Sequence, residues 1–208
     1  MLLFLPLVIG FLIAFLAVIP PGLINMTAAR ISTQDSRNAA VSFALGASTI
    51  IFFQTFIAVL FARFINNHKE IVTTLQEIGI FVFSLLSVYF FWIAKKPKKI
   101  KTDRTVKGKS SRFFLGMLLS TLNLLPIPFY VFASMSLYAS GYFSFDKIPV
   151  SSFVIGVVLG SFTVFYIYIA AFKKIEKKTE FLMRNINTII GSVTTFMAIV
   201  TLIKLLYD

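Results

Sequence analysis

Six long stretches of this sequence contain no charged residue, and they constrain the fold more than any other feature. They cover residues 1–29, 38–62, 78–94, 113–145, 148–172 and 185–203. A helix that crosses the hydrocarbon core of a membrane needs about 20 apolar residues, and five of the stretches meet that length. The shortest, 78–94, reaches it by including residues 71–76. The sequence therefore predicts an all-α integral membrane protein with six transmembrane helices.

Composition excludes several classes of function. Charged residues make up 13% of the chain, against about 25% in a typical soluble domain. The chain has no Cys and a single His, so it lacks the usual ligands of a transition-metal site. No catalytic pair of carboxylates and no Ser–His pair falls inside an apolar stretch. We therefore expect neither an enzyme nor a protein that holds a metal or another cofactor.

Basic residues predict the orientation of the helices. The chain carries a net charge of +12, and 16 of its 20 Lys and Arg residues fall in the loops after helices 1, 3 and 5. Loops rich in Lys and Arg stay in the cytoplasm. Both termini are therefore expected outside. Because the basic residues border apolar stretches instead of lining a groove, nucleic acid is not an expected partner.

The loop 95–112 holds nine of these basic residues. Its simplest role is to set the orientation of the chain in the membrane. The alternative is a binding site for anionic lipid headgroups, which clusters of basic residues beside a membrane attract.

The two halves of the chain resemble each other at glycine and proline positions. Segment 10–20 aligns with segment 116–126, and both begin with Gly and end with Pro. Further matched pairs follow downstream: Gly46 with Gly160, and Gly79 with Gly191. The chain is thus predicted to be a single transmembrane domain, 1–208, made of a three-helix repeat at 1–94, the basic loop 95–112 and a second repeat at 113–208. Because three is odd, the repeats enter the membrane in opposite directions, as in many secondary transporters.

Paired prolines interrupt the first and the fourth apolar stretch at matching places. Each proline removes a backbone hydrogen bond and clashes with the preceding turn, so helices 1 and 4 are predicted to be broken there. Backbone groups freed in a membrane are tolerated where they line a cavity, and matched breaks indicate a central binding site. Half-helix N-termini suit a carboxylate, and unwound carbonyls suit an ammonium group. The alternative is that the prolines only kink the helices for packing.

The candidate substrate-binding residues are the prolines and the polar residues near them. They are Pro20, Pro21, Gly22, Asn25, Gln54, Asn123, Pro126, Pro128 and Tyr130. Gln54 is included because an amide inside a membrane must find a partner. The alternative for Gln54 is a hydrogen bond between helices, without contact to substrate.

At these residues the chain resembles the LysE/RhtB family of amino-acid exporters over nearly its full length. Family members have six helices in two repeats and a Pro-Gly-Pro-type break in helix 1 followed by Asn. The corresponding residues here are Pro20-Pro21-Gly22 and Asn25, without a proline after Gly22. The family's Asn-Pro signature in helix 4 is present in a looser form, as Asn123 and Pro126.

The resemblance implies a secondary transporter in the bacterial cytoplasmic membrane that exports amino acids or similar small zwitterionic solutes. The expected partners are this substrate and the lipid bilayer. A homodimer is compatible with the closely spaced pair Gly156 and Gly160, because small residues let helices approach. The alternative function is a membrane scaffold or assembly partner that has the same fold and does not transport.

Overall fold

The computed structural model describes residues 4–68 and 109–184 without interruption, and further residues between 80 and 93 and between 188 and 203. The described residues are helical or lie in turns, and none of them forms a strand. The chain divides into two compact units, Met1–Phe64 with Thr102–Glu176, and Ile65–Lys101 with Lys177–Asp208. The first unit contains both proline pairs.

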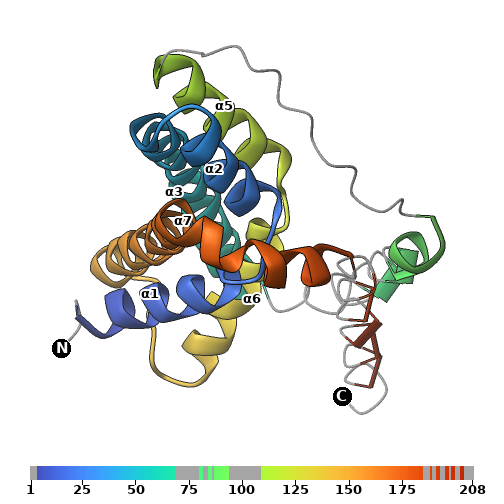
Figure 1. Ribbon diagram of the computed structural model, residues 1–208. Coiled ribbons are helices and arrows are strands. Elements are labelled where there is room, and N and C mark those ends of the chain that lie inside the picture. Colours follow the sequence, from blue (N-terminus) through green and yellow to red (C-terminus); the bar gives the residue numbers. More distant parts are fainter. Residues whose placement is uncertain are drawn as a thin grey trace. The chain divides into compact units, whose positions relative to one another are not determined.

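Figure 1 shows the helices of the described part. They are α1 (Phe4–Val18), α2 (Leu23–Gln34), α3 (Arg37–Asn67), α5 (Lys109–Leu122), α6 (Pro126–Ala139) and α7 (Lys147–Arg184). Two of them, α3 and the part of α7 up to Ala171, are long and apolar enough to cross a membrane singly. The pairs α1–α2 and α5–α6 reach that length only together. The described residues therefore account for up to four spans. The predicted third and sixth spans are described only in part.

Both predicted helix breaks are observed. The axes of α1 and α2 differ by 78°, and those of α5 and α6 differ by 66°. The two breaks use their prolines differently. Pro20 and Pro21 lie in the unwound linker of the first break, whereas Pro126 is the first residue of α6. A proline is tolerated in the first turn of a helix because the N–H that it lacks has no helical partner there. The second break therefore precedes its prolines.

Helix α3 buries its six alanines and exposes five of its six phenylalanines, with Phe43 as the buried one. The buried alanines are Ala39, Ala40, Ala44, Ala47, Ala58 and Ala62, and the exposed phenylalanines are Phe52, Phe53, Phe56, Phe61 and Phe64. A soluble helix places its large apolar side chains in the core. Helices in lipid gain nothing by hiding phenylalanine from water, and small residues let their backbones approach.

Glycines bring α1 against α7. A Cβ on Gly10 would collide with the carbonyl oxygen of Phe153, and one on Gly156 would collide with that of Leu7. Gly160 makes the same kind of contact one turn further on, with Phe11. These three positions therefore exclude any side chain, because the backbones touch there.

Glycines bring α5 against α3 in the same manner. A Cβ on Gly116 would collide with the carbonyl oxygen of Phe43, and one on Gly46 would collide with that of Phe113. Each of the helices that precede a break, α1 and α5, is therefore packed through glycines on a long helix from the other half of the chain.

In the second unit, the described residues include a π-helix at Tyr89–Ile93. The hydroxyl groups of Ser87 and Thr195 lie 2.5 Å apart, and Gly191 faces the ring of Phe91 at 3.0 Å from its ideal Cβ position. The predicted third and sixth apolar stretches therefore contact each other at these residues.

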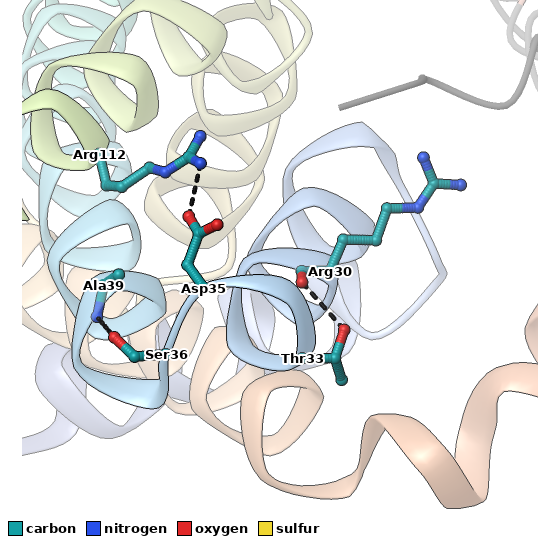
Figure 2. Close-up of polar contacts among 6 residues, drawn as sticks. All are labelled: Arg30, Thr33, Asp35, Ser36, Ala39 and Arg112. Carbon is teal, nitrogen blue, oxygen red and sulfur yellow. Dashed lines mark hydrogen bonds and ion pairs between the residues drawn. The ribbon is translucent and has the colours of Figure 1, made fainter. Parts of the chain in front are cut away.

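A buried ion pair connects the end of α2 to the start of α5. The Nη2 atom of Arg112 lies 2.5 Å from the Oδ2 atom of Asp35, and the two side chains are 4% and 9% exposed. Figure 2 shows the guanidinium of Arg112 pointing at this carboxylate, from α5 toward the α2–α3 corner. The corner is also bound to α7, because Arg37 donates to the hydroxyl of Tyr166 at 2.6 Å and lies over its ring. Arg112 was counted above as part of the basic loop, whereas here it is a buried residue of α5.

We expect the effect of the ion pair on stability to appear mainly when one of its two partners is removed. Removing one partner leaves a buried charge unpaired, so Asp35→Ala should lower the free energy of unfolding by about 3 kcal/mol. The double variant Asp35→Ala/Arg112→Leu should lose less than the single one, because no buried charge remains. Unfolding in detergent with increasing sodium dodecyl sulfate measures both.

The matched control for this experiment is Asp146→Ala, because Asp146 is an exposed carboxylate at the start of α7 with only a local bond to Ser144. Equal stability of Asp35→Ala and Asp146→Ala would show that the ion pair does not hold the α2–α3 corner.

Candidate functional site

At the first break, three consecutive backbone carbonyl groups accept hydrogen bonds from side chains. The Nδ2 atom of Asn25, in the first turn of α2, donates to the carbonyls of Val18 at 2.6 Å and Pro20 at 3.0 Å. The hydroxyl of Tyr168 donates to the carbonyl of Ile19 at 2.8 Å. Because Tyr168 belongs to α7, a helix of the second half of the chain stabilises the break in the first half.

The second break is stabilised in a similar way by a helix of the first half. The Nε2 atom of Gln54 on α3 donates to the carbonyls of Ser120 at 3.0 Å and Asn123 at 2.9 Å. The backbone N–H of Asn123 also donates to the Ser120 carbonyl, which closes the last turn of α5. The end of α5 is therefore bonded through one amide side chain that reaches across from a neighbouring helix.

The amide side chains thus have a structural role at the breaks. Asn25 and Gln54 use their NH₂ groups to bond backbone carbonyls at the interrupted helix ends. The hydrogen bond between helices, which was the alternative for Gln54, is present. It leaves the Oε1 atom of Gln54 buried and without a hydrogen-bond partner. Gln54 can therefore hold the break and still offer an acceptor.

The nine sequence-predicted residues differ in burial. Pro21, Asn25, Gln54 and Tyr130 are buried, Gly22, Asn123 and Pro126 are half-buried, and Pro20 and Pro128 are exposed. Hydrogen bonds join Asn25 to Pro20 and Gln54 to Asn123. Tyr130 packs edge-on against the ring of Phe153, which brings α6 onto α7.

Sequence reasoning missed Tyr168 as a residue of the first break. Tyr166 and Tyr168 are both polar residues in the apolar stretch 148–172, and the sequence does not distinguish their roles. In the structure, Tyr166 contacts Arg37 and Tyr168 bonds the break. Tyr168 is 149 residues from Ile19 along the chain, so only the packing of α7 on α1 brings the two together.

Several hydroxyl groups near the breaks are buried without a partner. Elsewhere in the described helices, Ser and Thr hydroxyls donate to the carbonyl three or four residues back, as those of Thr27, Thr49, Thr121 and Thr163 do. The Oγ of Ser120 and the Oγ1 of Thr55 have no such bond and no other partner, and their residues are 1% and 0% exposed. The Oγ of Ser48, one residue before Thr49 on α3, is also buried and unpartnered.

The segments around the two breaks, 4–29 and 113–145, contain no charged residue. Among the residues that the structure describes, no group of three or more His, Cys, Asp and Glu side chains could hold a metal ion. The breaks therefore offer hydrogen-bonding groups and helix termini without a formal charge. Such a set can bind a small polar solute that brings its own charges.

No curated protein and no solved structure matches this chain. A family model described as LysE type translocator matches residues 14–205, from the second half of α1 to beyond α7. The match covers most of the 208 residues and includes both helix breaks. The apolar spans and the bent helix pairs fit the membrane location of such a protein. The chain therefore belongs to the LysE type translocator family, a family of membrane transporters.

Proposed function

We propose that this chain is a secondary transporter that exports amino acids or similar small zwitterionic solutes across the bacterial cytoplasmic membrane, with the substrate at the two helix breaks. The observation that carries this proposal is that two helices are interrupted at matching places and that side chains bond the carbonyls there. Asn25 and Tyr168 bond the first break, and Gln54 bonds the second. Matched breaks of this kind are typical of the substrate sites of secondary transporters.

We also propose that the halves 1–94 and 113–208 are inverted-topology repeats. The glycine contacts support this, because they occur in matched pairs with the halves exchanged. Gly10 meets Phe153 as Gly116 meets Phe43, at offsets of 106 and 110 residues.

The second pair of contacts, Leu7 with Gly156 and Phe113 with Gly46, has the same two offsets. It matches Gly46 with Gly156, one turn away from the Gly160 that alignment of the sequence suggests. An exchanged arrangement of this kind lets one half move against the other, which is how secondary transporters alternate access to their site.

If the substrate binds at the first break, Asn25→Ala should reduce export. Without the amide, the carbonyls of Val18 and Pro20 lose their partners in a buried place, and each lost bond costs about 1–3 kcal/mol. The initial rate of amino-acid efflux from loaded cells that overexpress the chain should fall at least about ten-fold, and Pro21→Ala should reduce it as well.

The matched control is Thr27→Val, because the hydroxyl of Thr27 bonds only the carbonyl of Leu23 in its own helix. All three variants are to be compared at equal amounts in the membrane. Normal efflux by Asn25→Ala and Pro21→Ala would place the substrate elsewhere. If the unaltered chain accelerates the loss of none of the amino acids, the scaffold function is favoured instead.

The orientation is tested by labelling introduced cysteines, since the natural chain has none. Ser110→Cys, at the exposed start of α5, should react with a membrane-impermeant maleimide only when the cytoplasmic side is accessible. Ser140→Cys, in the exposed turn after α6, should react from outside. Reaction of Ser110→Cys in intact cells, with protection of Ser140→Cys, would reverse the proposed orientation and place both termini inside.

A further inference from the structure

The two breaks differ in the hydrogen-bond donors that they offer. Helix α2 begins after Gly22, and no side chain caps the N–H groups of its first turn. Helix α6 begins with Pro126 and has a second proline at Pro128, and neither residue has an N–H. The N–H groups of Ile127 and Phe129, between and after these prolines, donate to the carbonyls of Leu124 and Leu125. The first turn of α6 therefore has no free N–H for a substrate, and it is unsuited to an anion.

The second break instead offers acceptors. Gln54 has its Nε2 bonded to the end of α5, which leaves its Oε1 buried and unpartnered. The residue is 5% exposed. The Oγ of Ser120 is also unpartnered, in a residue that is 1% exposed and whose carbonyl Gln54 bonds. The two unpartnered oxygens thus belong to residues in direct contact.

The hydroxyl of Ser120 differs from that of the next residue on α5. Thr121, the next residue on α5, directs its hydroxyl to the carbonyl of Met117 in its own helix. Ser120 makes no such bond. A buried polar atom without a partner is costly, and a native structure keeps one where a water or a ligand completes it. The end of α5 also carries the negative end of the helix dipole, which favours a positive charge there.

We propose that the second break is the ammonium-binding end of the transport site, where the Oε1 of Gln54 and the Oγ of Ser120 accept hydrogen bonds from the substrate's ammonium group. This inference rests on the proposed function and adds the orientation of the substrate in the site. The ammonium group lies at the α5–α6 break, and the carboxylate is left to the donors of the other break. Net-neutral zwitterions fit this arrangement because the site has no formal charge of its own.

The test compares each amino acid with the 2-hydroxy acid that has a hydroxyl in place of the ammonium group. The purified full chain is reconstituted into liposomes, and exchange of labelled L-alanine, L-leucine and L-phenylalanine is measured. L-lactate, L-2-hydroxyisocaproate and L-3-phenyllactate serve as the matched competitors. Loss of one hydrogen bond to a charged group corresponds to about a ten-fold loss of affinity. Ser120→Ala should therefore weaken binding of the amino acid about ten-fold and that of the hydroxy acid less than about two-fold.

Thr121→Val is the matched control, because it removes a neighbouring hydroxyl that is already bonded within α5. It should change neither affinity. Alanine favours the helix, so Ser120→Ala is expected to fold, and an unchanged elution profile in detergent confirms that it does.

Four results would overturn the ammonium site. The first two are an unchanged amino-acid affinity in Ser120→Ala and, in the same variant, an equal loss of affinity for the amino acid and its hydroxy acid. The third is an effect of Thr121→Val as large as that of Ser120→Ala. The fourth is that exchange by the unaltered chain depends on Na⁺ and that Ser120→Ala abolishes this dependence. The last would assign the two oxygens to a monovalent cation. Exchange of none of the three amino acids by the unaltered chain would instead count against the proposed function, and the ammonium site would fall with it.

Discussion

A carbonyl group that leaves a helix inside a membrane has no water to bond, and much of the described structure satisfies this constraint. At the break after α1, Asn25 and Tyr168 donate to the carbonyls of Val18, Ile19 and Pro20. Unpaired backbone groups in hydrocarbon cost several kcal/mol each, so these bonds are a condition for the break to exist. They also tie the break to α7, a helix of the other half of the chain.

Close packing makes such long-range bonds possible. Gly10 and Gly156 let α1 touch α7, and Gly46 and Gly116 let α3 touch α5. A side chain at any of these positions would push the helices apart and move Tyr168 or Gln54 away from the carbonyls that it bonds. The ion pair between Asp35 and Arg112 connects the α2–α3 corner to α5, and the hydrogen bond from Arg37 to Tyr166 connects it to α7. Packing and polar bonding thus depend on each other.

The sequence predicted the breaks well because proline acts locally. A proline in the interior of a helix removes a backbone hydrogen bond whatever surrounds it, so Pro20, Pro21, Pro126 and Pro128 mark the interrupted regions without knowledge of the neighbours. It could not predict which polar residues hold the breaks, since Tyr168 and Gln54 reach carbonyls of other helices. Nor could it show that Arg112, one of many basic residues near the loop 95–112, is buried against a carboxylate.

The sequence by itself determined that this is a helical membrane protein with two interrupted helices. The apolar stretches follow from the membrane as solvent, and the interruptions follow from the backbone of the prolines themselves. Tertiary structure alone decided how the hydroxyls and amides are used. Ser120 and Thr121 are adjacent and chemically alike, yet Thr121 bonds its own helix while Ser120 is buried against Gln54 without a partner for its hydroxyl. The difference arises because the two residues lie on different sides of α5. Ser120 is on the side that α3 covers, and Thr121 is on an exposed side.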